Sequence, residues 1–430
     1  MLNRLQQPPL CTPRQMDILR PQTSLLPNGA TLHWLHAGEH EVVRLDIVIE
    51  GGRWHQQQPL QALFTNRMLR EGTSTYTSAQ IASRLDYYGA WLELSCTMQH
   101  SCLTVYTLTK YLPQTLELLQ SMLTEPLFPE AEFQVVRDTN LQQFQVNLSK
   151  VSFLAHRSLM QAVYGPDHPC GRAIEESDYH SLDAESLHSF YDRFYHPHRM
   201  HLFLFGKIDD EALRLVTDSL GSCTFGSHLL QPLPSTDFPI EPAKEQRFFT
   251  ERPDAMQSAV RMGLITIDNR HPDFQKLRLL VTLFGGYFGS RLMSNIREEK
   301  GYTYGIGADL ATHPGSTLLH IHTETANEYV PALITEVYHE IDRLQNELVS
   351  QEELSMVKNY KLGEMCREME SVFSLADAWI FVHNYGLTDH YYSNMLEDVK
   401  STTPAEIRDL AIRYLCKEKL KEAIAGKKIS

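Results

Sequence analysis

The pattern of hydrophobic and polar positions follows the same order in the two halves of the chain. In each half, a helical pattern ends at a glycine, two strand-like runs follow, and a tyrosine, an aliphatic residue and a proline then open another helix. Proline suits the first helical turn, where its missing N–H has no partner in any case. In the first half these features lie at Gly89, 91–97, 101–108 and Tyr111-Leu112-Pro113, and in the second half at Gly301, 303–310, 317–323 and Tyr329-Val330-Pro331.

A long helix is predicted to follow in each half. One begins at Leu127-Phe128-Pro129-Glu130 and runs to about Tyr164, and the other begins at Ser350, with Glu353 completing a capping box, and runs to about Val382. The repeated order predicts an α+β protein of two duplicated domains, each a mostly antiparallel sheet packed against helices. Prolines punctuate a linker between them. We expect an N-terminal extension at 1–24, domains at 25–222 and 246–430, and the linker at 223–245.

Composition narrows the class of protein. A length of 430 residues suits two domains, and the net charge of −14 argues against a nucleic-acid partner. No run approaches the ~18 apolar residues of a membrane span, so no membrane partner is expected. The seven scattered cysteines include no Cys-x-x-Cys, which indicates a reducing compartment and favours the cytoplasm.

The segment 51–73 has the layout of a metal-binding helix. A strand at 42–50 runs into Gly51-Gly52, an amphipathic helix follows, and Gly72-Thr73 ends it. This layout resembles the N-terminal half of the pitrilysin, insulinase and mitochondrial processing peptidase family, whose helix carries the zinc motif His-x-x-Glu-His. Segments 164–172 and 190–206 also resemble that family, and the resemblance spans about residues 25–425.

The family's zinc ligands and catalytic base are missing from this chain. Matched to the family motif, the two histidine positions hold Leu63 and Arg67, the glutamate position holds Asn66, and the third ligand falls at or next to Gln143. Leucine has no donor atom, guanidinium stays protonated, and an amide is a poor zinc ligand. The family's asparagine on the next strand also has no counterpart, with Glu93 nearest. The resemblance therefore implies a zinc-deficient member that contains no catalytic metal of its own.

A second family feature is intact in GSRLMSNIREEKGYTYGIG, at 289–307. Arg297 and Tyr304 have the spacing of an arginine and a tyrosine that, in the family, face the zinc across the substrate cleft. A guanidinium can bind a substrate carbonyl or carboxylate, and a phenol can donate to a developing oxyanion. We expect a helix with Arg297 to end at Gly301 and the next strand to contain Tyr304. Taken alone, such a pair is more often a solvated arginine and a packing tyrosine.

The resemblance implies half of a clamshell chamber and a split enzyme. In this hypothesis the chain is the zinc-free subunit of a heterodimer that binds unfolded or extended peptides, while a homologous chain with an intact His-x-x-Glu-His carries the zinc; a homodimer is the other possible assembly. One alternative is an inactive peptide-binding or scaffold protein. Another is a hydrolase with a relocated metal site at His320, His322 and Glu324, which share one strand face and could instead line the chamber.

Overall fold

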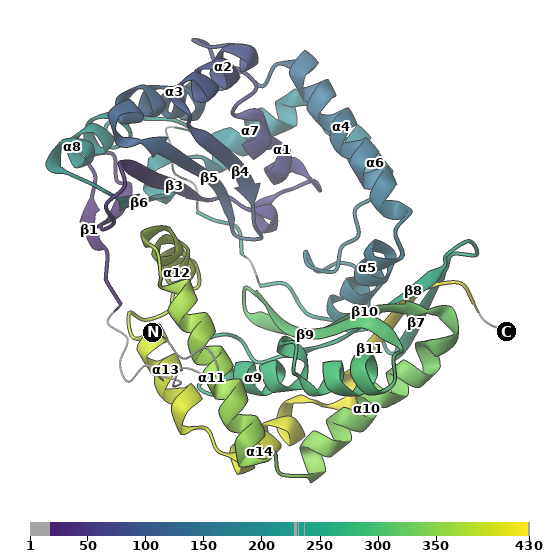
Figure 1. The fold of residues 1–430 in the computed structure, drawn as a ribbon. Coiled ribbons are helices and arrows are strands. Elements are labelled where there is room, and N and C mark those ends of the chain that lie inside the picture. The colour runs from purple at the N-terminus through teal and green to yellow at the C-terminus, as the bar shows by residue number, and fades with distance from the viewer. Residues whose placement is uncertain (1–17, 228–229, 231, 236, 429–430) are drawn as a thin grey trace, which may run out of the picture.

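The computed structural model describes residues 18–227, 230, 232–235 and 237–428 and shows two halves whose sheets face one another (Figure 1). Residues 1–17 of the expected extension and Cys11 therefore lie outside the described part. Within it, no helix is both long and apolar enough to cross a membrane. The described cysteines all carry free thiols: Cys96, Cys102, Cys170, Cys223, Cys366 and Cys416.

The first sheet has six strands. They are β1 (Gln22–Leu25), β2 (Thr31–His36), β3 (Val42–Glu50), β4 (Trp91–Cys96), β5 (His100–Leu108) and β6 (Met200–Gly206). Their order in space is β1-β2-β6-β3-β5-β4, with β2 and β6 parallel and the other neighbouring pairs antiparallel. The sheet begins three residues before the position expected for the start of the domain.

The second sheet repeats this topology. Its strands are β7 (Arg247–Glu251), β8 (Gln257–Thr266), β9 (Thr303–His313), β10 (Ser316–Ala326) and β11 (Lys421–Gly426). The order β7-β11-β8-β10-β9 matches β2-β6-β3-β5-β4 strand for strand, including the parallel pair, which here is β7 and β11. The predicted duplicated, mostly antiparallel α+β fold is therefore confirmed.

Helices cover the outer face of each sheet (Figure 1). On the first sheet, alternate residues of β3, such as Leu45 and Ile47, are fully buried in a cluster with outer helices. These helices are α1 (Gln61–Met68), α2 (Ser78–Tyr88), α3 (Leu112–Thr124), α7 (Ala184–Phe194) and α8 (Asp210–Ser219). Around the second sheet lie α9 (Phe274–Val281), α10 (Val330–Asn346), α13 (Tyr391–Ser401) and α14 (Pro404–Tyr414).

The prediction of one long helix in each half is wrong, because each helix is broken. The first becomes α4 (Glu130–Leu148) and α5 (Val151–Tyr164), and the second becomes α11 (Gln351–Glu368) and α12 (Val372–Asn384). Lys150 has an extended backbone between α4 and α5, and Ser371 has one before α12, where its side chain accepts a hydrogen bond from Ser374 N. Serine favours such N-cap positions over a helix interior.

The breaks let each half place a helix on the sheet of the other half (Figure 1). Helix α5 crosses the second sheet, where Ala155 meets Ala259 and Ala425, and all three are fully buried. These small side chains permit close packing of helix on sheet. Helix α12 packs on the first sheet, and its Trp379 belongs to one buried cluster with Phe203 and Phe205 of β6.

A buried arginine on the first sheet holds α12 in place. Arg44 of β3 donates hydrogen bonds from Nε and Nη2 to the Asp46 carboxylate at 2.8 and 3.0 Å. It also reaches across to α12, where Nη2 meets Asp377 Oδ1 at 2.6 Å and Nη1 meets Phe373 O at 2.9 Å. Burial raises the pKa of the Asp46 carboxyl even though Arg44 bonds to it. Removing the guanidinium would therefore leave the Asp46 carboxyl buried without its charged partner, which destabilises the fold.

We predict that Arg44→Met lowers the free energy of unfolding by about 3–5 kcal/mol, because it breaks a buried ion pair and detaches α12. Urea denaturation followed by circular dichroism measures the change. Arg20→Met is the matched control, since Arg20 and Asp389 form an exposed ion pair at 3.6 Å that contributes at most about 1 kcal/mol. Equal losses for the two variants would contradict the role given to Arg44.

Candidate functional site

The positions that match the family's zinc ligands lie on α1 and α4 of the first half. Leu63 and Arg67 are half-buried on α1, Asn66 is fully buried there, and Gln143 is exposed on α4. Arg67 and Gln143 line one cavity of about 440 Å³ between α1, α4 and α5. The structure thus brings Arg67 and Gln143 to a common cavity, whereas Leu63 and Asn66 are not among its lining residues.

Asn66, at the position of the family's catalytic glutamate, is bonded into the sheet. Its amide nitrogen Nδ2 donates to Ser95 O at 2.7 Å and to Cys102 O at 3.1 Å. Its Oδ1 accepts from the Tyr195 hydroxyl at 3.1 Å. A carboxylate here would turn an acceptor toward two carbonyl oxygens, which is repulsive. Asn66 therefore fastens α1 to β4 and β5 and is not available as a base.

Arg67, at the second histidine position, places a cation where a metal would bind. Its Nη1 donates to Asn140 Oδ1 on α4. Burial lowers the pKa of the guanidinium, opposed by Tyr179 and Cys96, but arginine remains protonated in proteins. With Leu63 lacking a donor atom and Asn66 committed to the sheet, these residues do not fit a zinc ion.

The cavity around Arg67 is basic, in contrast to the acidic chain as a whole. Arg53, Arg67, Arg157 and Arg172 are among its lining residues, and no Asp or Glu is. Arg157 forms an ion pair with Glu175 just outside this lining. A second cavity of about 330 Å³ lies beside it, bounded by α1, α4 and the edge strand β4, and it contains Glu93. The first cavity thus favours anionic groups, whereas the second is lined by residues of both charges.

Arg297 and Tyr304 lie next to one another in the second half. Arg297 lies in η5 (Met293–Glu299), a π-helix that ends two residues before Gly301, and Tyr304 follows on β9, as expected. Gly301 turns the chain between them with a φ of 66°, a left-handed conformation that favours glycine. Short π-helical segments are frequent at functional sites.

Contacts within the protein orient the Arg297 side chain, and Tyr304 is exposed to solvent. Arg297 Nε donates to the Tyr304 carbonyl at 2.9 Å, and its guanidinium lies 4.5 Å from the centre of the Phe288 ring. Its Nη1 lies 3.7 Å from Glu298. The Tyr304 residue is 94% exposed. The backbone bond and the ring orient the guanidinium, while the phenol remains accessible to a ligand.

The histidine row on β10 is organised differently from the expectation. His320 and His322 share one strand face, but their partner is Asp309 of β9, whose Oδ2 lies 3.5 and 3.3 Å from their Nδ1 atoms. Glu324 pairs instead with Arg261 of β8 at 3.7 Å. His320 also meets His156 of α5, with ring centres 5.7 Å apart. Asp309 was missed because the hairpin register, not sequence spacing, sets it opposite His320.

Family models match both halves of the chain. Residues 36–176 match "Insulinase (Peptidase family M16)", and residues 181–361 match "Peptidase M16 inactive domain". The two matches are four residues apart, and the second begins within the first half, before α7.

Curated relatives extend the match along most of the chain. An "Uncharacterized zinc protease YmxG" of Bacillus subtilis is 22% identical over 336 residues, which is 77% of this chain and 80% of the relative. A "Non-peptidase homolog YmxG" of Helicobacter pylori is 21% identical over 360 residues, 82% of this chain and 81% of the relative.

Solved structures share the fold. A peptidase M16 inactive domain from Pseudomonas fluorescens superposes with a TM-score of 0.87 at 22% identity, covering 96% of this chain and 99% of that one. The periplasmic protease PqqL of Escherichia coli gives a TM-score of 0.78 at 16% identity and covers all of this chain but 49% of its own. The chain therefore corresponds to about half of that longer protein.

We predict that Asn66→Asp destabilises the chain by about 3 kcal/mol, because it removes two buried donors and sets a carboxylate against Ser95 O and Cys102 O. Urea denaturation of the two proteins measures the difference. Gln143→Glu, an amide-to-acid change at the exposed α4 position, should stay within about 0.5 kcal/mol. If both variants keep full stability, the hydrogen bonds of Asn66 do not hold α1 against β4 and β5.

Proposed function

Because the chain belongs to the insulinase family, peptidase family M16, we propose that it is the zinc-free subunit of a peptidase pair. In this assignment it binds extended peptide, and a homologous chain supplies the catalytic zinc. The observation that carries the assignment is the division between the halves. The α1 helix has no residues that fit a metal, whereas Arg297 and Tyr304 are assembled and accessible on the second half.

The side chains at the α1 positions make hydrogen bonds within the protein, which supports the absence of metal binding there. Asn66 makes three hydrogen bonds that a glutamate could not reproduce, and Arg67 bonds to Asn140 on the facing helix. A lone substitution at a ligand would leave the other ligands in place. Here each position has a different local role, so the first half serves as a wall of the chamber.

The second half offers the chemistry that peptide binding requires. The Arg297 guanidinium can donate to a backbone carbonyl or a carboxylate, and the Tyr304 hydroxyl can donate to an oxyanion as it forms. Main-chain bonds can come from β4, an edge strand beside the α1 cavities, through strand addition. Such bonds give affinity for extended peptides without strict sequence preference.

We expect the zinc to come from a partner chain, because Leu63, Asn66 and Arg67 of α1 do not fit a metal ion. The partner we expect carries an intact His-x-x-Glu-His. A homodimer would lack any such helix and is disfavoured on that ground.

A second candidate is a peptide-binding or scaffold protein without any part in catalysis. The similarity to the Helicobacter pylori relative, a non-peptidase homologue, favours it. The two candidates differ in what Arg297 does. Only a catalytic subunit needs its guanidinium for turnover by the partner.

We predict that the chain alone cleaves nothing, and that it supports peptide cleavage when mixed with its zinc-bearing partner. Arg297→Ala and Tyr304→Phe should each lower the partner-supported rate by about 100-fold, because each removes a donor to the transition state. Cleavage of a quenched fluorescent peptide measures the rate.

Arg214→Ala is the matched control for this experiment, since Arg214 is an exposed arginine on α8 whose pairs lie on the same helix. It should leave the rate unchanged. Wild-type rates in the Arg297→Ala and Tyr304→Phe mixtures would reject the catalytic subunit and favour the scaffold.

The basic cavity predicts a preference for peptides with carboxylate side chains. A short extended acidic peptide should bind more tightly than a basic one of equal length, and the double variant Arg53→Gln, Arg172→Gln should weaken its binding about tenfold. Fluorescence anisotropy at low and high salt checks both points, because salt screens exposed charges. Equal affinity for the acidic and basic peptides would contradict the preference.

A further inference from the structure

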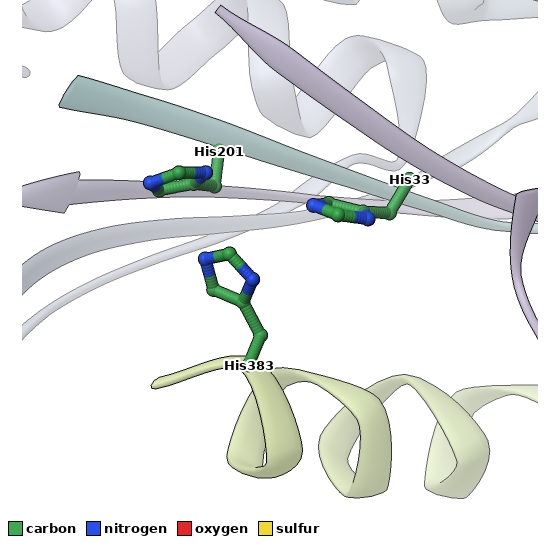
Figure 2. Close-up of side chains that lie close together, drawn as sticks. All are labelled: His33, His201 and His383. Atoms are coloured by element: carbon green, nitrogen blue, oxygen red, sulfur yellow. The ribbon is translucent and has the colours of Figure 1, made fainter. Parts of the chain in front are cut away.

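Three histidines from distant parts of the chain converge where α12 meets the first sheet. His33 of β2 and His201 of β6 project from the sheet, and His383 projects toward them from the last turn of α12 (Figure 2). The His383 ring centre lies 4.3 Å from that of His201 and 5.1 Å from that of His33. One nitrogen from each ring lies within 4.8 Å of the others.

Two of these rings present a buried nitrogen that has no hydrogen-bond partner among the described residues. These atoms are His33 Nε2 and His201 Nδ1. A buried polar atom without a partner is costly, and native structures seldom leave one unexplained. Two such atoms in rings that lie against a third imidazole therefore call for a ligand.

The remaining nitrogen of each of these two rings is already oriented. His33 Nδ1 lies 2.9 Å from Thr23 Oγ1, and His201 Nε2 lies 3.6 Å from Glu50 Oε1. Metal-bound histidines commonly use one nitrogen for the metal and the other for a carboxylate or another oxygen. The partners of His33 and His201 match that arrangement.

Burial lowers the pKa of His33 to about 4 and that of His383 to about 3, in each case together with the neighbouring His201. These two rings therefore favour the neutral form, which is the form of imidazole that binds a metal.

We propose that His33, His201 and His383 bind one divalent transition-metal ion, zinc foremost, which fastens α12 of the second half to the first sheet. Three imidazole nitrogens with one open position make a known type of zinc site. Nitrogens that share a tetrahedral zinc lie about 3.3 Å apart, so modest rotation of the three rings completes the geometry. All-nitrogen sites also accept Co²⁺, Ni²⁺ and Cu²⁺ but not Mg²⁺ or Ca²⁺.

This site lies apart from the α1 positions and departs from the sequence-based expectation of a chain without metal. It requires neither peptide binding nor a partner chain. The ion would join residues of both halves at the contact between α12 and the first sheet, which Arg44 also stabilises. Loss of the ion would loosen α12 without changing Arg297 or Tyr304.

The test uses the full chain after treatment with a chelator. Zinc added to the protein should bind at about one equivalent by isothermal titration calorimetry. At a free zinc concentration about 100 times the dissociation constant, it should raise the melting temperature by about 3–6 °C. Co²⁺ should give the visible absorption of a nitrogen-ligated site, and Mg²⁺ should give no shift.

Substitutions then identify the ligands. His383→Phe keeps an aromatic ring and should lower zinc affinity at least tenfold, whereas His383→Cys keeps a ligand and should retain binding. His339→Ala, an exposed histidine on α10, is the matched control and should bind as the wild type does. If His383→Phe fails to fold by circular dichroism, His33→Phe replaces it.

Asp309→Asn separates this site from the Asp309, His320 and His322 cluster, the other candidate among the described residues. Zinc binding that persists in the His383→Phe or His33→Phe variant but disappears in Asp309→Asn would overturn the assignment. Absence of zinc binding in the wild type would do the same. Neither result bears on peptide cleavage, so the proposed function stands or falls separately.

Discussion

Each sheet of this protein packs part of its inner face against a helix that belongs to the other half of the chain. The exchange of α5 and α12 is a packing constraint, because it buries apolar side chains of both sheets, such as Phe203 on the first and Ala259 on the second. It joins the two halves through their cores and fixes how the sheets face one another. Arg44 reinforces it by bonding across the contact to Phe373 and Asp377.

The position of the candidate site depends on this exchange. The cavity beside Arg67 is closed by α4 and α5 of its own half, and α5 is held in place by the second sheet. The α1 helix can therefore lose its metal chemistry without losing its scaffold, since Asn66 binds it to β4 and β5. The α1 region therefore keeps the family's fold, and its cavity is lined by arginines where the family binds zinc.

The three-histidine cluster lies on the same contact for a physical reason. The inner face of the first sheet is apolar near Phe203 and polar near Glu50 and His201, and the end of α12 reaches the boundary between them. Hydrogen bonding within the described residues leaves two nitrogens there unpaired. A metal at this place would strengthen the exchange that the hydrophobic packing begins.

The sequence by itself determined that the two halves repeat one order of helices and strands, and the family resemblance implied the missing ligands on α1 and the Arg297 and Tyr304 pair. The repeated order follows from local periodicity, and a short turn at Gly301 makes Arg297 and Tyr304 adjacent. Only the tertiary structure decided that both long helices break, that Asp309 and not Glu324 meets His320, and that His33, His201 and His383 converge. The Asp309 pairing depends on strand register and the histidine convergence on how α12 packs against the sheet, and no local pattern of residues records either.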